Sequence, residues 1–209
     1  MSARFGAGMT SIAHKLGLSR RKSQREQRAV PMTGDPPGAR EKDEYYGTPP
    51  WVTDALLTVE PFFGAVWEPA CGHGLIASRL AEHGHEVVAT DLVNRGHGQS
   101  GVDFLMEPRL LAPNIVTNPP FKLAREFAQH AMDIGATKCA LLLRLAFMQG
   151  GDRTPWLFRS GLRRVYVIAK RITFVAAPGR PAFTSNFVDG YGWFVWQAGY
   201  RGAVELVAT

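Results

Sequence analysis

The sequence has only two cysteines among its 209 residues, and it has no apolar run long enough to cross a membrane. Cys71 and Cys139 stand alone in apolar surroundings, without the paired spacing of a zinc site or a disulfide framework. A membrane helix needs roughly 20 apolar residues in a row, and a secretory signal needs an apolar segment near the N-terminus. We therefore expect a soluble protein of the reducing cytoplasm, in which neither thiol is a nucleophile.

Histidines with the spacing of metal ligands are also lacking. Structural metal sites draw on ligand pairs that are regularly spaced along the chain, and no such pairing is present here. The histidines in question are His73, His83, His85 and His97. We expect them to be structural or to face solvent, and we expect no metal.

Positive charge is concentrated at the N-terminus. Residues 1–40 hold eight basic and two acidic residues, so they carry the whole net charge of +6. Because they are rich in Gly, Ser, Arg and Pro, they predict a mostly disordered basic tail. A second basic stretch, residues 144–180, holds eight basic residues against Asp152 alone. This asymmetry favours a polyanionic partner; the alternative is that the arginines form a solvated face or structural ion pairs.

Residues 41–209 predict one α/β domain. Residues 65–80 show a short strand, a glycine turn and an amphipathic helix. Further strands or strand-like segments are predicted at residues 86–91, 101–105, 114–117, 138–143, 164–169 and 191–196. The run at 138–143 is continuously apolar, as is typical of a central parallel strand. A helix capped by Thr53 or Asp54 is expected before the first strand, and another is expected to begin near Lys122.

Residues 118–121, Asn-Pro-Pro-Phe, follow the strand predicted at 114–117. Two consecutive prolines donate no backbone hydrogen bonds and restrict the residues before them, so the chain leaves the sheet in a preset shape. The Asn118 amide oxygen and the Pro119 carbonyl then offer two acceptors for one amino group, with Phe121 as a flat apolar surface. The pattern predicts a site for an aromatic amine; the alternative is an ordinary turn.

Residues 68–74, Glu-Pro-Ala-Cys-Gly-His-Gly, predict a loop in which Gly72 and Gly74 let the backbone approach a ligand. The loop lacks the third glycine of a dinucleotide-binding motif, so pyrophosphate binding is not favoured. Asp91 ends the second strand, where an acid commonly accepts hydrogen bonds from a ribose. Asp103 and Phe104 offer an acceptor and a packing surface for an adenine, unless they simply end a strand.

In this order, the motifs resemble class I S-adenosylmethionine-dependent N6-adenine DNA methyltransferases of the gamma type. The resemblance covers about residues 45–200, and it includes Tyr46-x-Thr48-Pro49 as the family's first motif. Residues 171–174 and 193–196 are similar to compact phage or prophage enzymes of this group. The resemblance implies a Rossmann-like class I methyltransferase fold, with a mostly parallel seven-stranded sheet and helices on both faces.

The resemblance also implies the roles of individual residues. The implied cofactor-binding residues, for S-adenosylmethionine, are Tyr46, Thr48, Pro49, Glu68, Pro69, Ala70, Cys71, Gly72, Gly74, Asp91, Leu92, Asp103, Phe104 and Asn118. The implied catalytic residues are Asn118, Pro119, Pro120 and Phe121. The expected substrate contacts are Phe121, Lys122, Arg153, Arg171, Phe174, Arg180 and Phe183.

The implied reaction is methyl transfer to N6 of an adenine flipped out of DNA. Two alternatives stay open: an RNA adenine-N6 or protein-glutamine methyltransferase, and a non-catalytic DNA-binding protein that keeps the fold. After Phe121 the chain has little more than the residues that complete the sheet, so we expect no separate target-recognition domain. Loops at 149–160 and 174–190 are expected to replace it, which predicts a short or loose recognition sequence, or help from a partner chain.

Overall fold

The computed structural model describes residues 46–151, 153–175, 183–184 and 190–209, and it leaves the side chains of residues 183–184 undescribed. The chain divides into two compact units, Met1–Met32 and Thr33–Thr209, and every described residue belongs to the second. The basic tail predicted at residues 1–40 lies outside the described residues. So do Arg180 and the side chain of Phe183, which were expected to contact the substrate.

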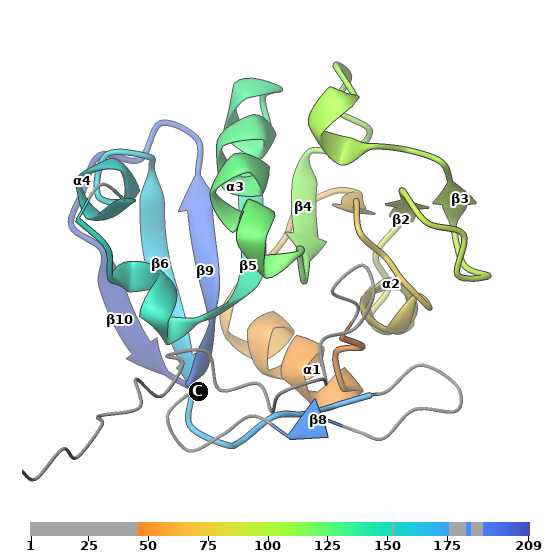
Figure 1. Cartoon of the computed structure of the whole chain (residues 1–209), viewed down its shortest axis with the longest axis horizontal. Coiled ribbons are helices and arrows are strands. Elements are labelled where there is room, and N and C mark those ends of the chain that lie inside the picture. The colour runs from red at the N-terminus through yellow and green to blue at the C-terminus, as the bar shows by residue number, and fades with distance from the viewer. Residues whose placement is uncertain (1–45, 152, 176–182, 185–189) are drawn as a thin grey trace, which may run out of the picture. The chain divides into compact units, whose positions relative to one another are not determined.

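An eight-stranded sheet forms the centre of the second unit (Figure 1). From one edge to the other, its strands are β10 (Glu205–Ala208), β6 (Leu162–Ile168), β9 (Tyr191–Gln197), β5 (Lys138–Arg144), β4 (Asn114–Thr117), β1 (Val66–Glu68), β2 (Val87–Asp91) and β3 (Gln99–Ser100). Neighbouring strands are parallel except that β9 runs antiparallel to both β5 and β6. The predicted mostly parallel α/β fold is confirmed, with one strand more than expected because β10 adds an edge.

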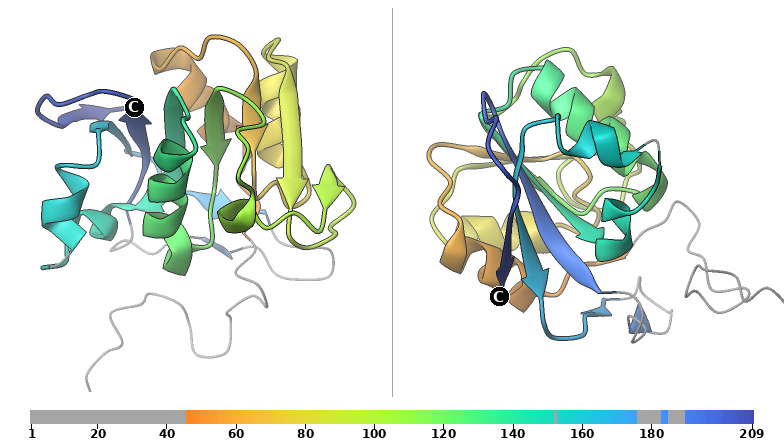
Figure 2. Two further views of the ribbon diagram at one scale, coloured as in Figure 1. Left: turned by 90° about the horizontal axis from the view of Figure 1, so that it is seen from above. Right: turned by 90° about the vertical axis from the view of Figure 1, so that its left-hand side faces the viewer.

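The helices cover both faces of this sheet, as predicted. They are α1 (Pro50–Val59), α2 (Leu75–Glu82), α3 (Ala124–Asp133) and α4 (Arg153–Leu157), with short 3-10 turns η2 (Phe104–Met106), η3 (Phe121–Leu123) and η4 (Leu145–Met148). Because successive side chains of a strand point to opposite faces, β5 feeds two cores. Leu141 and Leu143 pack with Phe127 of α3, whereas Leu142 packs with Leu56 of α1. Figure 2 shows α1 and α2 on one side of the sheet and α3 and α4 on the other.

Two local predictions were wrong, and a third was correct to within two residues. Helix α1 begins at Pro50, so neither Thr53 nor Asp54 caps it; proline suits the first helical position because the N–H it lacks would have no partner there. Residues 101–105 form no strand, because β3 ends at residue 100 and Asp103 caps η2. The helix expected near Lys122 begins at Ala124, after the turn η3.

The order of the strands determines where a ligand can bind. Strand β1 pairs with β2 on one side and with β4 on the other, so the direction in which the sheet is built reverses at β1. In open parallel sheets, ligands bind at such a reversal, beyond the carboxyl ends of the strands. The loop at 68–74 and residues 118–121 both begin at these ends.

A two-stranded hairpin lies apart from the main sheet. It pairs β7 (Thr173–Phe174) with β8 (Phe183–Thr184) in antiparallel fashion. Directly after β7, Val175 forms an isolated antiparallel bridge with Gly47, which ties the start of the described chain to this hairpin. Among the described residues, no helix combines the length and apolarity needed to cross a bilayer.

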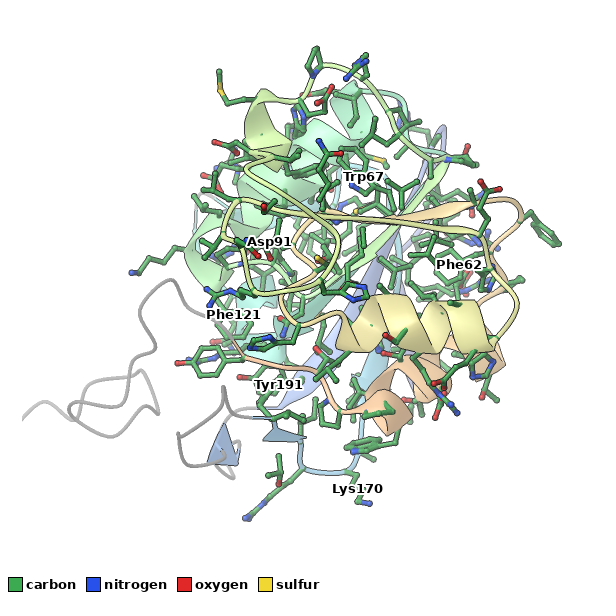
Figure 3. The ribbon with its side chains drawn as sticks, turned by 90° about the vertical axis from the view of Figure 1, so that its right-hand side faces the viewer. Phe62, Trp67, Asp91, Phe121, Lys170 and Tyr191 are labelled. Atoms are coloured by element: carbon green, nitrogen blue, oxygen red, sulfur yellow. The ribbon has the colours of Figure 1, made fainter. Side chains whose placement is uncertain are left out.

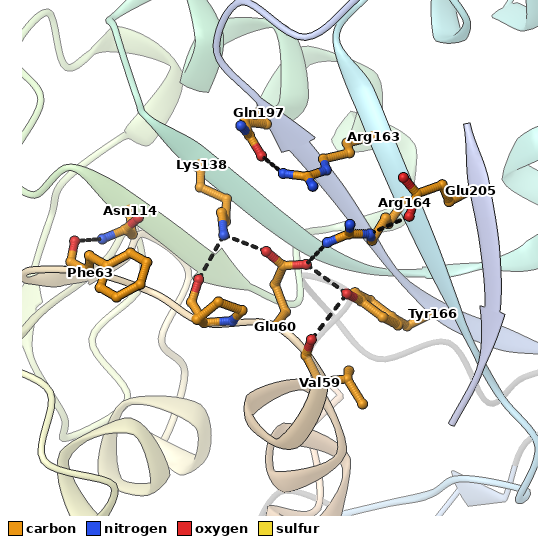
Figure 4. A network of polar contacts seen from close by, with 11 residues as sticks. Val59, Glu60, Phe63, Asn114, Lys138, Arg163, Arg164, Tyr166, Gln197 and Glu205 are labelled. Atoms are coloured by element: carbon orange, nitrogen blue, oxygen red, sulfur yellow. Dashed lines mark hydrogen bonds and ion pairs between the residues drawn. The ribbon is translucent and has the colours of Figure 1, made fainter. Parts of the chain in front are cut away.

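A buried ionic network closes the opposite end of the sheet, near the amino ends of β5 and β6 (Figure 4). Glu60, only 1% exposed, binds Lys138 through Oε1, and its Oε2 accepts hydrogen bonds from Tyr166 at 2.7 Å and Arg164 at 3.3 Å. Arg164 also pairs with Glu205 of β10 at 2.6 Å. Burial raises the pKa of Glu60, but the bonds from Lys138, Tyr166 and Arg164 outweigh it and hold the pKa below its usual value. The network therefore joins α1, β5, β6 and β10 around one ionised carboxylate.

Replacing Glu60 with alanine is expected to lower the free energy of unfolding by about 3 kcal/mol, because it leaves Lys138 and Arg164 partly buried without their shared partner. Glu205→Ala is the matched control: it removes an exposed carboxylate from the same Arg164 and is expected to cost less than about 1 kcal/mol. Urea unfolding at pH 7 measures both. The difference between wild type and Glu60→Ala should shrink as the pH falls below 4.5, because a carboxyl with a lowered pKa stabilises the fold only while it is ionised. Equal losses in the two variants contradict this account.

Candidate functional site

A cavity of about 520 Å³ opens at the carboxyl ends of β1, β2 and β4. Most residues predicted to bind a cofactor line it: Tyr46, Thr48, Glu68, Pro69, Ala70, Cys71, Asp91, Leu92, Asp103, Phe104 and Asn118. Pro49, Gly72 and Gly74 do not line it. In Figure 3, Asp91, Phe121 and Tyr191 follow one another down one side of the view, which places the end of β2, the turn after β4 and the start of β9 at the same edge.

The side chain of Asn118 is held in one orientation. Its Nδ2 donates hydrogen bonds to the carbonyl oxygen of Tyr46 at 2.9 Å and to Oγ1 of Thr48 at 3.2 Å. Because a carbonyl can only accept, the amide nitrogen must face Tyr46, and the flipped amide is excluded. Its Oδ1 is buried and has no hydrogen-bond partner among the described residues. A buried acceptor without a partner is costly, so this oxygen marks the place where a donor is expected to bind.

A second free acceptor follows directly. The carbonyl of Pro119 accepts no hydrogen bond within the described part of the chain, whereas the next carbonyl, of Pro120, accepts one from the N–H of Leu123 at 2.9 Å. Proline at positions 119 and 120 removes both backbone donors that would otherwise lie beside these oxygens. Among the described residues, neither Oδ1 of Asn118 nor the carbonyl of Pro119 is therefore bonded to a donor.

The glycine loop is fixed by backbone hydrogen bonds. The N–H of Gly72 donates to Oδ2 of Asp91 at 2.8 Å. Gly74 has φ +78°, and a Cβ there would lie 2.3 Å from the ring of His97. Both the backbone conformation and the packing of His97 therefore favour glycine at position 74. His73, whose Nδ1–H donates to the carbonyl of Arg95 at 2.8 Å, holds the same pair of loops together.

Two aspartates line the cavity, and backbone N–H groups fix the orientation of their carboxylates. Asp91 accepts from Gly72 through Oδ2 and from Val93 through Oδ1, at 2.8 Å each. Asp103 accepts from the N–H of Leu105 at 3.0 Å through Oδ1. Phe104 beside it is 2% exposed and packs edge-on against Trp67 at 5.1 Å between ring centroids. The two carboxylates are thus oriented before any ligand binds.

Glu68 is the most deeply buried carboxyl that lines the cavity, at 1% exposure. Its Oε2 accepts a hydrogen bond from the N–H of Ala77, near the start of α2, at 2.7 Å. Burial raises its pKa well above the usual value of 4.5; the bond from Ala77 opposes this shift, and the carboxylate of Asp91 adds to it. A positively charged ligand in the cavity would stabilise the ionised form.

Neither thiol has the properties of a nucleophile. Burial and the neighbouring carboxyls of Glu68 and Asp91 raise the pKa of Cys71 to about 12. Burial also raises the pKa of Cys139. Both side chains are therefore neutral thiols near pH 7.

Four aromatic rings form a closed group beside residues 118–121. Phe121 lies nearly parallel to Tyr46, with 6.0 Å between ring centroids, and it also contacts Tyr191 at 6.0 Å. Phe174 contacts the other two members, Tyr46 at 6.0 Å and Tyr191 at 5.1 Å. Arg144 places its guanidinium 5.1 Å from the centre of the Phe121 ring and donates to the hydroxyl of Tyr191 at 3.2 Å. We refer to Tyr46, Phe121, Phe174 and Tyr191 as the aromatic group.

The remaining predicted substrate residues are distributed over several elements. Lys122 lines the cavity. Phe174 is 1% exposed and belongs to the core. Arg153 lies on α4 with its guanidinium 4.6 Å from the centre of the Phe147 ring, and Arg171 is exposed just before β7. Of the described members, only Lys122 therefore contributes to the cavity itself.

Part of the cavity lining was not predicted from the sequence. The residues concerned are Gly47, Leu75, Ile76, Val93, Arg95, Val102, Leu105, Leu123 and Phe127. Leu123 and Phe127 fall in or next to the helix predicted to begin near Lys122, and nothing in the sequence marked them as cavity residues. Val93 and Arg95 come from the loop after β2, which carries no periodicity and no motif. Within the described residues, no cluster of three or more His, Cys, Asp or Glu side chains is arranged to hold a metal ion.

Comparisons with known proteins identify the fold. No protein-family model matches the sequence, and no curated protein matches it either. Among solved structures, PH1948 of Pyrococcus horikoshii, provisionally named an RNA methyltransferase, aligns over 75% of this chain and 87% of its own, with 13% identity and a TM-score of 0.53. The predicted O-methyltransferase Atu636 of Agrobacterium tumefaciens aligns over 77% and 85%, with 13% identity and a TM-score of 0.50. A structure concerned with conversion of a disulfide bond into a thioacetal group during echinomycin biosynthesis aligns over 75% and 84%, with 11% identity and a TM-score of 0.52. The chain therefore shares the Rossmann-like fold of these methyltransferases.

Replacing Glu68 with glutamine is expected to change how stability depends on pH. The unfolded chain releases the Glu68 proton near pH 4.5, whereas the folded state keeps it to higher pH, so the carboxyl costs stability as the pH rises above 4.5. Glu68→Gln cannot ionise and keeps an acceptor for the N–H of Ala77. Its free energy of unfolding, relative to wild type, should rise as the pH increases above 4.5, until the carboxyl of the folded wild type also ionises, in urea titrations of the ligand-free protein. Two parallel pH profiles would show that the buried carboxyl has no raised pKa.

Proposed function

We propose that this protein transfers a methyl group from S-adenosylmethionine to N6 of adenine in DNA. The observation that carries the proposal is the orientation of Asn118. Asn118 lines the ligand-sized cavity with a buried Oδ1, the carbonyl of Pro119 follows directly in the chain, and neither oxygen accepts a hydrogen bond from the described residues. An amino group with two hydrogens is the simplest partner for such a pair.

The cavity suits S-adenosylmethionine in size and in charge. Its volume of about 520 Å³ lies within the range of small-molecule sites. Its carboxyls, Glu68, Asp91 and Asp103, suit a cofactor that carries a sulfonium and an ammonium group. Asp91 stands at the end of β2, where an acid commonly binds the ribose hydroxyls, and Asp103 with Phe104 provides an acceptor and a ring surface for the adenine. When bound, the cofactor supplies a methyl group on a good leaving group.

Asn118 and Pro119 activate the amine in this proposal. The N6 lone pair of adenine is delocalised into the ring, so the amine is a weak nucleophile until its hydrogens are held out of the ring plane. The two acceptors hold these hydrogens, and their bonds strengthen as the nitrogen becomes tetrahedral and positive, which stabilises the transition state more than the ground state. The N–C bond forms as the C–S bond breaks, sulfur keeps the electron pair, and the nitrogen then releases one proton to water. No strong base is required at the attacking step.

DNA is the proposed polymer because of residues 68–72 and the upstream Thr-Pro. These residues resemble those of DNA adenine methyltransferases more than those of RNA or protein-glutamine methyltransferases, which also contain Asn-Pro-Pro-Phe. A paired adenine hides its amino group, so a duplex substrate requires base flipping. Phe121 is half-buried next to the acceptor pair and is the proposed stacking surface, and Lys122 at the cavity edge is suited to a phosphate. The fold itself does not select the substrate, since its relatives act on different molecules.

The purified protein is expected to incorporate the labelled methyl group of S-adenosylmethionine into unmodified plasmid DNA as N6-methyladenine. Asn118→Ala should lower kcat by at least about 100-fold, because it removes one of two groups that stabilise the transition state. The affinity for S-adenosylmethionine, measured by calorimetry, should change less than about threefold. Asn94→Ala, a variant of an exposed asparagine outside the cavity lining, is the matched control and should keep kcat within about twofold.

The same assay separates the alternatives. Transfer to total RNA or to protein, with none to DNA, would refute the DNA assignment and keep the chemistry. Binding of DNA without any transfer would support a non-catalytic protein with this fold. Full activity of Asn118→Ala would refute the role given to that residue.

A further inference from the structure

The orientation of Asn118 depends on a segment with little structure of its own. Both acceptors of its Nδ2, the Tyr46 carbonyl and the Thr48 hydroxyl, belong to residues 46–48, which precede α1. This segment contains no helix and only a single β-bridge residue. Its position must therefore be set by what it packs and bonds against.

That bridge joins the segment to the chain that follows β7. The N–H of Gly47 donates to the carbonyl of Val175 at 3.1 Å, and the N–H of Val175 donates to the carbonyl of Gly47 at 2.7 Å. Gly47 lies between the two residues that bind Asn118. The reciprocal pair of bonds thus fixes the backbone at the midpoint of the segment.

The aromatic group fixes the same segment from its other end. Phe174, 1% exposed, packs its ring against those of Tyr46 and Tyr191. Tyr191 begins β9, which is paired with β5 in the main sheet, so its backbone is anchored. Phe174 therefore joins Tyr46 to a fixed point while its neighbour Val175 joins Gly47 to the hairpin.

We propose that Phe174 and Val175 are positioning residues for methyl transfer. The ring of Phe174 and the main-chain N–H of Val175 hold residues 46–48 in place. From there, the Tyr46 carbonyl and the Thr48 hydroxyl bind the amide nitrogen of Asn118 and aim its Oδ1 into the cavity. The proposal rests on the function proposed above. It also means that the β7–β8 hairpin, outside the cavity, is coupled to the catalytic amide through two residues.

A small displacement of residues 46–48 is enough to lower the rate of methyl transfer strongly. Misplacement of a reacting group by about 1 Å can cost about 100-fold in rate. If the bridge opens, the Tyr46 carbonyl no longer holds the amide nitrogen of Asn118. The carboxamide can then rotate, so that its nitrogen takes the position of its oxygen. An amide nitrogen facing the cavity would donate to the substrate where an acceptor is needed.

Val175→Pro tests this directly, because proline lacks the N–H that bonds to Gly47. The change suits the site: the side chain of Val175 is 42% exposed, and the residue before it lies in a strand, as proline prefers. Val175→Ala is the matched control, since it keeps the N–H. We expect Val175→Pro to lower kcat by about 10- to 100-fold while KM for S-adenosylmethionine changes less than threefold, and Val175→Ala to stay within about twofold of wild type.

A second measurement reports on Asn118 without requiring any activity. The chain has four asparagines, so selective ¹⁵N labelling gives four side-chain NH₂ signals, and that of Asn118 is identified by its absence in Asn118→Ala. In wild type its hydrogens should exchange slowly with water because both are bonded. In Val175→Pro they should exchange at least about tenfold faster, and in Val175→Ala at the wild-type rate.

The outcomes separate the two proposals. If wild type transfers no methyl group to any substrate, the proposed function fails, and the exchange measurement alone decides the positioning role. A folded Val175→Pro protein with wild-type exchange and wild-type kcat overturns that role. If Val175→Pro does not fold, Thr48→Val is measured instead, because it removes the hydroxyl that accepts from Nδ2 of Asn118 without changing the size of the side chain. Faster hydrogen exchange of the Asn118 amide and a lower kcat, both restored in Thr48→Ser, support the proposal. Unchanged exchange and kcat overturn it.

Discussion

The hydrogen bond from Asn118 Nδ2 to the carbonyl of Tyr46 is the interaction on which the site depends. A carbonyl cannot donate, so this one bond decides which end of the carboxamide faces the cavity. The same bond connects the start of the described chain to the end of β4 and thereby closes one side of the cavity. The prolines after Asn118 complete the arrangement, because they bring no backbone N–H of their own and the carbonyl of Pro119 accepts no backbone hydrogen bond from the described residues.

The two ends of the sheet use polar groups in opposite ways. At the amino ends of β5 and β6, both oxygens of Glu60 are bonded, and the network contributes to stability. At the carboxyl ends of β1 and β4, Glu68 has a raised pKa, and Oδ1 of Asn118 has no hydrogen-bond partner in the part of the chain that the structure describes. Unsatisfied groups of this kind cost free energy in the ligand-free protein, and a ligand recovers that free energy when it binds.

Much of the fold was predictable because its signals are local. The apolar run of β5 and the strand, glycine turn and helix after residue 65 depend on residues close together in sequence, and the carboxylate of Asp91 marks the end of β2. The motif at 118–121 indicated two acceptors, but the sequence alone does not say which way the amide of Asn118 points. That orientation comes from the Tyr46 carbonyl, and hence from a bridge between Gly47 and Val175, which are distant in sequence and carry no pairing signal.

Other features depended equally on tertiary contacts. At position 74 the ring of His97 occupies the space that a side chain would need, and the sequence gives no sign of this packing contact. The start of α1 was misplaced because aspartate is a common helix cap, whereas Asp54 lies inside the helix. There it bonds to Arg79 of the neighbouring helix α2 and to His83, which caps the end of α2. Residues that serve distant partners in this way resemble local signals in the sequence, and only the fold distinguishes them.

The most direct test of the central claim is a crystal structure of the protein with S-adenosylhomocysteine, the product that lacks the transferable methyl group. The account predicts the ribose hydroxyls at Asp91 and the adenine between Asp103 and Phe104, with the sulfur facing Asn118 and Oδ1 of Asn118 still free to accept an amine. A ligand that binds outside the cavity, or one that itself donates to Oδ1 of Asn118, would contradict it.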